Sequence, residues 1–152
     1  MPIDAEAAKA LSFEPLTVNI ERGRLRFFAK ATGQTDPLYT DVDAARRAGH
    51  RDLPVPPTFL FSLEMEQPEP FGYLVALGVD LRRLLHGEQS FTYHRPAFAG
   101  DSLTLRPRIT DVYSKKGGAL EFLVKRTDIS RGGEPIAEAR SVLIVRAAEV
   151  AA

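Results

Sequence analysis

The C-terminal part of the chain constrains the fold most, because it consists almost entirely of β-strand signals. From residue 88 onward, four runs are rich in β-branched and aromatic residues, at roughly 88–95, 102–113, 119–129 and 135–146. Short segments rich in glycine, proline and charged residues separate them, which is typical of turns. This spacing predicts an antiparallel meander of four strands.

Alternation within these runs predicts which face of the sheet is buried. In the run 119–129, Phe122 and Val124 are apolar, whereas Glu121 and Lys125 are charged. Successive side chains of a strand point to opposite faces of its sheet. The pattern therefore predicts that Phe122 and Val124 face the core and that the charged residues face water.

The N-terminal half of the chain predicts one strand followed by helices. Alternating residues indicate a strand over 16–20, and helical spacing follows over 21–32. A second helix is expected over 42–48 with Thr40 as its cap, and Pro57 is expected in the first turn of a third, apolar helix. One strand, then helices, then four antiparallel strands predicts an α+β domain whose sheet wraps around the third helix.

The length of the chain predicts a single domain. A chain of 152 residues is long enough to bury one core and short for two. We expect an N-terminal tail at 1–12, one domain at 13–147 and a C-terminal tail at 148–152. The apolar stretch 71–85 does not distinguish helix from strand.

Composition argues against several classes of function. The chain has 20 basic and 20 acidic residues, so no overall charge favours binding to nucleic acid or to an anionic membrane. It has no cysteine, which excludes disulfides, thiolate metal sites and a cysteine nucleophile. Neither a secretory signal nor an apolar run long enough to span a bilayer is present. We therefore expect a cytoplasmic protein.

Three local motifs resemble one family of enzymes. They are TGQTDPLYTD at 32–41, VPPTF at 55–59 and HGEQSFTYHRPAFAGD at 86–101. Through these motifs the chain resembles the MaoC-like dehydratases and (R)-specific enoyl hydratases. It resembles more closely the amino-terminal, fatty-acid-synthase-type dehydratase branch of that family. The likeness covers about 14–146. It implies a hot-dog fold, an antiparallel sheet wrapped around a central apolar helix.

The resemblance also implies a reaction, for which this chain lacks the two catalytic groups. Active members add water to an enoyl thioester, or remove it from a 3-hydroxyacyl thioester, with an Asp and a His as acid and base. The matching positions here are Gln34 and Tyr39. Glutamine does not titrate, and a tyrosine with a pKa near ~10 is a poor base at neutral pH. Each acid/base role contributes roughly 10²–10⁴-fold, so we expect no catalytic residue in this chain.

The remaining residues of these motifs have alternative interpretations. Asp36 is either a displaced catalytic carboxylate or a turn residue that caps local amides. Gln34 and Tyr39 either line a ligand channel or fill the space of a lost active site. The backbone amides of Thr58 and Phe59, near the start of the third helix, are the candidate donors to a thioester oxygen.

The histidines and basic clusters are less specific. His50, His86 and His94 do not have the spacing of a metal site, so neither metal nor cofactor is expected. The clusters Arg22–Arg26 and Lys125–Arg126 either contact the phosphates of a coenzyme A or carrier arm, or belong to a solvated face.

We interpret the chain as a non-catalytic hot-dog subunit. It would bind 3-hydroxyacyl or enoyl thioesters of coenzyme A or an acyl-carrier protein, and pair with a catalytic MaoC-like partner. Pairing would cover the unpaired sheet edge, which a homodimer would also do. The alternatives are a self-sufficient hydratase or dehydratase, using Asp36 with Tyr39 or a histidine (His86 or His94), and an acyl-thioester binding protein without chemistry.

Overall fold

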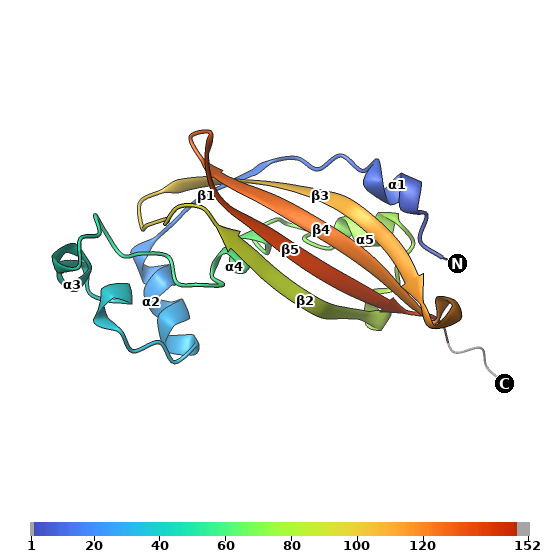
Figure 1. Cartoon of the computed structure of the whole chain (residues 1–152), viewed down its shortest axis with the longest axis horizontal. Helices are drawn as coiled ribbons and strands as arrows, with labels where there is room; N and C mark the ends of the chain where they lie inside the picture. The colour runs from blue at the N-terminus through green and yellow to red at the C-terminus, as the bar shows by residue number, and fades with distance from the viewer. Residues whose placement is uncertain (1, 149–152) are drawn as a thin grey trace.

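The computed structural model, which describes residues 2–148, contains one antiparallel sheet of five strands. The strands lie in the order β1-β3-β4-β5-β2 (Figure 1). Their bounds are Leu16–Asn19 for β1, Leu84–Tyr93 for β2, Ser102–Lys115 for β3, Leu120–Arg131 for β4 and Glu134–Arg146 for β5. The sheet and its short helices confirm the α+β class.

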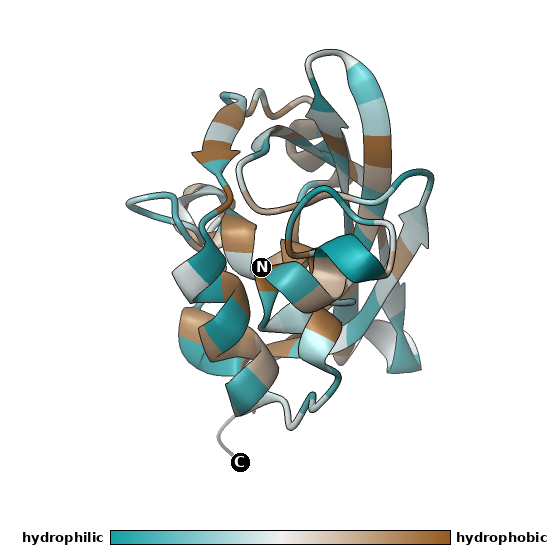
Figure 2. Cartoon of the chain, turned by 90° about the vertical axis from the view of Figure 1, so that its left-hand side faces the viewer, coloured by the Kyte–Doolittle hydropathy of each residue, from teal (hydrophilic) through white to brown (hydrophobic). Residues whose placement is uncertain are grey.

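Short helices connect and cover the strands. The α-helices are α1 Ala5–Lys9, α2 Arg22–Ala31, α3 Val42–Arg47, α4 Leu60–Glu64 and α5 Gly72–Ala76, and the 3₁₀ helices are η1 Pro37–Tyr39, η2 Leu81–Arg83 and η3 Lys116–Gly118. In Figure 1, α2 and α3 gather at one end of the sheet, while α1 lies at the other. Figure 2 views the α2 and α3 end and shows that these helices carry both hydrophobic and hydrophilic residues.

The four expected runs are confirmed as β2 to β5, but the meander is wrong for β2. This strand pairs with β5, with Phe91 opposite Ala139, and not with β3. After Tyr93 the chain crosses to the far side of the sheet, and Ala97 and Ala99 are buried on the way. The free side of β2 therefore forms one edge of the sheet.

Alternation predicted the burial of β4 only in part: Val124 is buried as expected, but the face that carries most of the core residues is the other one. Leu123 and Ile129 are fully buried in the core, and Lys125 shares their face and contacts Glu64 of α4. Phe122 lies on the outer face, where its ring stacks on Tyr113 at 4.9 Å between centroids. The prediction that Lys125 is a solvated or phosphate-binding residue is therefore wrong, because an acidic partner allows its burial.

Two helix starts also differ from the predictions. Asp41, not Thr40, caps α3, and its carboxylate accepts hydrogen bonds from the amides of Asp43 and Ala44. The third helix exists as α4, but it begins at Leu60, so Pro57 does not lie in its first turn. The ambiguous stretch 71–85 forms α5, η2 and the start of β2.

The core consists of two hydrophobic clusters, which lie at different positions along the strands. The first cluster contains Val18, Ile20, Leu25, Ala45, Leu53, Phe59, Leu60, Leu63, Ala97, Ala99, Leu103, Leu105, Ile129, Ile136, Ala137 and Ala139. The second cluster contains Ile3, Ala8, Leu74, Val79, Ile109, Leu123, Leu143 and Val145.

A polar layer lies between the two clusters. Lys125 of β4 is opposite Ser141 of β5, both are buried, and Lys125 forms an ion pair with the buried Glu64. The ammonium group of Lys125 lies 5.5 Å from the ring centroid of Tyr73. Burial raises the pKa of Tyr73, and the carboxylate of Glu64 raises it further, so the phenol stays protonated.

The segment expected as an N-terminal tail contains α1. Asp4 caps this helix, and the buried residues Ile3 and Ala8 belong to the second cluster. The backbone N–H of Ile3 donates to Glu121 Oε1 at 2.6 Å. Of the expected C-terminal tail, Ala148 is exposed and 149–152 lie outside the described residues. Within residues 2–148, no helix has the length and hydrophobicity needed to cross a membrane.

Candidate functional site

The loop that carries the family motif lies between α2 and α3 and is held by its own backbone. The amide of Gln34 donates to the carbonyl of Ala29 at 2.9 Å, and Gly33 has a φ of 72°, which ends α2. The hydroxyl of Thr32 donates to the carbonyl of Phe28 at 2.8 Å. The loop therefore leaves the helix in one defined direction.

Gln34 and Asp36 make contacts within this loop. The side-chain oxygen of Gln34 accepts a hydrogen bond from the amide of Asp36 at 3.1 Å. The carboxylate of Asp36 accepts one from the amide of Leu38 at 3.1 Å and caps η1. Both side chains thus stabilise the turn, as an Asx-type turn does.

Tyr39 contributes to a cavity of about 350 Å³, which we call the loop cavity. Its lining comes from η1, the proline segment before α4, the start of α4, the end of β2 with the segment after it, and β5. The lining residues are Tyr39, Pro54, Val55, Pro57, Leu60, Tyr93, His94, Arg95, Pro96, Ala97 and Ile136. Gln34 is not part of this lining. Of the two positions that match the family's catalytic pair, Tyr39 therefore lines the cavity and Gln34 does not.

A strained residue lies beside the loop cavity. Thr58 has a φ of 71°, a left-handed conformation that is rare for a β-branched residue. Its amide donates to Tyr93 Oη at 3.0 Å, and the amide of Phe59 donates to the carbonyl of Pro56 at 3.2 Å. Both candidate oxyanion donors are therefore occupied by protein groups, and both precede α4 rather than belonging to it.

The three histidines lie in different surroundings. His94 lines the loop cavity together with Tyr39, which is the position that the alternative with a histidine base requires. His86 lies further back on β2, with its Nε2 3.1 Å from Gln89 Oε1 and its ring 5.1 Å from that of Phe61. The ring of His50 lies 5.7 Å from that of Phe98. Within residues 2–148, no three His, Asp or Glu side chains are grouped as metal ligands.

The arginines of α2 form ion pairs and hydrogen bonds with other residues of the chain. Arg22 forms a bidentate pair with Asp52, Arg24 pairs with Glu66, and Arg26 donates to the carbonyl of Thr40 at 2.9 Å. The hydrogen bonds from Arg22 lower the pKa of Asp52. These contacts fix α2 against its neighbouring segments, as a structural face does.

Comparison with known proteins places the chain among dehydratase domains. The family described as "FAS1-like, dehydratase domain region" matches residues 7–139. A UPF0336 protein of Streptomyces coelicolor is 39% identical over 140 residues, which cover 90% of this chain and 92% of that protein. A UPF0336 protein of a Parafrankia species is 36% identical and covers 96% of both chains.

Solved structures show the same fold. The HadBC (3R-hydroxyacyl-ACP dehydratase) complex of Mycobacterium tuberculosis has a chain with a TM-score of 0.77 and 26% identity, covering 95% of this chain and 98% of that one. The (R)-hydratase of A. caviae, at 21% identity, has a TM-score of 0.63 and covers 90% of this chain and 98% of that one. These likenesses confirm the hot-dog fold and the resemblance to MaoC-like dehydratases. The chain belongs to the family of FAS1-like dehydratase domain regions.

Proposed function

We propose that this chain is a non-catalytic dehydratase subunit that binds an enoyl or 3-hydroxyacyl thioester and pairs with a catalytic hot-dog partner. The observation that carries the proposal is the loop itself. Gln34 and Tyr39 occupy the positions of the family's acid and base, and the Gln34 side chain is engaged in the turn. Neither residue can transfer a proton efficiently at neutral pH.

The exposed edge of the sheet supports pairing with a second subunit. Within residues 2–148, the ten-residue β2 pairs with β5 alone, and its residues Leu85 and Tyr93 are 47% and 51% exposed. A long edge strand with apolar side chains favours association with another strand. The similar HadBC structure is a complex of subunits, which fits the same interpretation.

The test is hydration of a crotonyl thioester by the purified chain, alone and mixed with a catalytic hot-dog subunit that carries the intact Asp and His loop. We expect no turnover by the chain alone and turnover by the mixture above that of the partner alone. Both coenzyme A and acyl-carrier thioesters should be offered, since either carrier fits the proposal. Turnover by this chain alone would overturn it.

A matched pair of variants tests the proposed edge. Leu85→Glu introduces a charge on β2, and Val75→Glu introduces the same charge on an apolar residue of α5 that is 58% exposed. We expect Leu85→Glu to weaken association with the partner at least about ten-fold, since a buried unpaired charge is costly at an interface. Val75→Glu should leave it unchanged. Equal binding by both variants would exclude the β2 edge.

One observation favours a second candidate function, hydration by this chain alone with His94 as the base. His94 lines the same cavity as Tyr39, and a neutral imidazole has a ring nitrogen that can accept a proton. In that case the isolated chain turns over crotonyl thioester, and His94→Gln abolishes the activity while His86→Gln does not. Saturable thioester binding without turnover, alone or in the mixture, would instead indicate a binding protein.

A further inference from the structure

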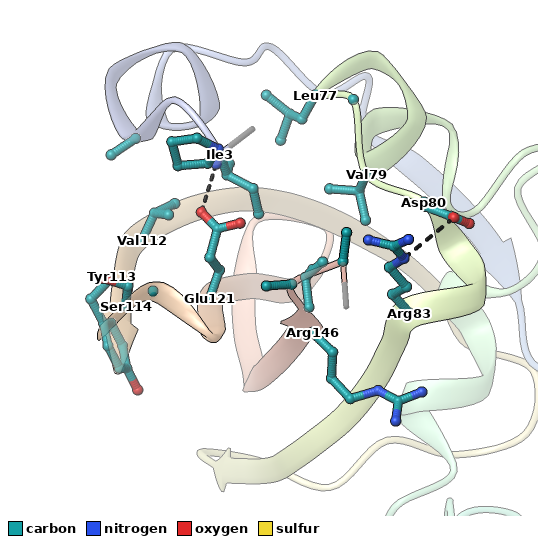
Figure 3. Close-up of a pocket in the computed structure, with 17 residues that line it drawn as sticks. Ile3, Leu77, Val79, Asp80, Arg83, Val112, Tyr113, Ser114, Glu121 and Arg146 are labelled. Atoms are coloured by element: carbon teal, nitrogen blue, oxygen red, sulfur yellow. Dashed lines mark hydrogen bonds and ion pairs between the residues drawn. The ribbon is translucent and has the colours of Figure 1, made fainter. Parts of the chain in front are cut away.

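A second cavity lies at the other end of the sheet from the loop. This distal cavity has a volume of about 560 Å³, within the range of small-molecule sites. Figure 3 shows it between the segment before α1, the loop that leads into η2 and the ends of the long strands. None of the residues that line the loop cavity takes part in it.

The inner wall of the distal cavity is apolar. Ile3, Val79 and Val145 belong to the second cluster and are each less than a tenth exposed, and Leu77 and Val112 pack against that cluster. All of them line the cavity. Apolar surface that is open to a cavity favours a ligand with an alkyl chain, because binding removes both surfaces from water.

Two arginines line the cavity: in Figure 3 the guanidinium group of Arg83 points toward the other lining residues, whereas the side chain of Arg146 points away from them. Arg83 comes no closer to Asp80 than 3.6 Å, from its Nε to Oδ2. Arg146 forms no ion pair within residues 2–148. Both guanidinium groups therefore retain donors for an anion.

The acidic residues of the cavity are already engaged. Asp80 accepts a bidentate pair of hydrogen bonds from Arg82, with Nη2 2.8 Å from Oδ2, and Arg82 does not line the cavity. Glu121 accepts the amide of Ile3 at 2.6 Å. Because Arg82 offsets the charge of Asp80, the two lining arginines outnumber the one remaining carboxylate, that of Glu121, and the local charge favours an anionic ligand group.

We propose that the distal cavity binds a medium-chain carboxylate. The alkyl chain would lie against Ile3, Val79 and Val145. The carboxylate would be held by Arg83, and by Arg146 once its exposed side chain turns toward the cavity. A guanidinium group matches a carboxylate in both charge and hydrogen-bond geometry. The site is separate from the loop cavity, so it does not depend on the proposed subunit function.

The test is titration of the full chain with octanoate, followed by backbone amide chemical shifts and by calorimetry. We expect saturable binding with a dissociation constant on the order of 10⁻⁴ M for a ligand of this size. The shifts should concentrate around Val79, Ser114 and Arg146, and not around Tyr39. Octanol tests the alkyl chain without the charge, and acetate tests the charge without the chain; both should bind at least about ten-fold more weakly.

Exposed arginines allow matched variants that keep the fold. Arg83→Met and Arg146→Met each keep the alkyl stem, and each should weaken octanoate binding by about ten-fold, the usual scale for one charge-assisted contact. Arg95→Met, in the loop cavity, is the control and should have no effect. Equal binding by all three variants, shifts confined to the loop cavity, or no saturation below the micellar concentration would each overturn the proposal.

Discussion

The two cavities at opposite ends of the sheet's inner face are lined by different kinds of residues. At the loop end, prolines, aromatic rings and a strained turn surround Tyr39, and the local arginines are paired with acids. At the distal end, aliphatic residues of the second cluster line a cavity together with two arginines that have free donors. The loop end carries the family motif, whereas the distal end carries features that the motif does not explain. One small fold can thus present two chemically unlike cavities.

The polar layer keeps these ends apart. Glu64 and Lys125 are buried where the two clusters meet, so the apolar core is not continuous from one cavity to the other. A buried ion pair contributes little net stability compared with apolar residues of the same size, although breaking it is costly. The Glu64–Lys125 pair is therefore better explained by its separation of the two hydrophobic clusters than by a contribution to the stability of the fold.

Removing one member of this pair should have the largest effect. Lys125→Met leaves the Glu64 carboxylate buried without its partner, so we expect a loss of about 3–5 kcal/mol in the free energy of unfolding. Urea denaturation measures it. The double variant Glu64→Met/Lys125→Met should recover most of the loss, because the two clusters then merge. A double variant less stable than Lys125→Met would show that the layer is needed for folding itself.

Cavity-forming substitutions test whether the two clusters act separately. Leu63→Ala in the first cluster and Leu74→Ala in the second should each cost about 2–5 kcal/mol, since both side chains are fully buried. The two variants should differ in their effect on ligand binding at the distal cavity. We expect Leu74→Ala to weaken octanoate binding and Leu63→Ala to leave it unchanged. Equal weakening by both would mean that the polar layer does not isolate the ends.

The strain at Thr58 should be visible as a difference between two small residues. Glycine adopts a positive φ freely and alanine does not, so Thr58→Gly should be more stable than Thr58→Ala by about 1 kcal/mol. Thermal denaturation compares them. Tyr93→Phe serves as a control, because it removes the acceptor of the Thr58 amide without changing φ. Equal stability of the glycine and alanine variants would contradict strain at this turn.

The smallest effect concerns pH at the distal end. Hydrogen bonds from the side chain and backbone of Arg82 lower the pKa of Asp80 from 3.8 to about 2. A pKa that is lower in the folded chain gives stability that is fully present above 3.8 and is lost as the pH falls through about 2. Asp80→Asn should therefore flatten the acid side of the stability curve slightly. An NMR titration of the Asp80 carboxyl group with a midpoint near 3.8 would contradict this.

Sequence patterns predicted the strands well and the sites poorly, for physical reasons. Alternation marks strands, but it cannot show that β2 pairs with β5. Alternation also predicted that Lys125 is exposed to solvent, because Glu64, the partner that allows its burial, lies on a helix distant in the sequence. The family loop was found from its motif, whereas His94 reaches the loop cavity only through the fold. The distal cavity combines residues from both ends of the chain and has no local signal.

The unpaired edge of β2 also has a consequence for the supply of this chain in a cell. A strand of ten residues with exposed Leu85 and Tyr93 can template non-specific strand addition until another surface covers it. Chains made in excess of the molecule that covers this edge would aggregate or be degraded. Under the proposed pairing, we expect the abundance of this chain to follow that of its partner rather than its own rate of synthesis.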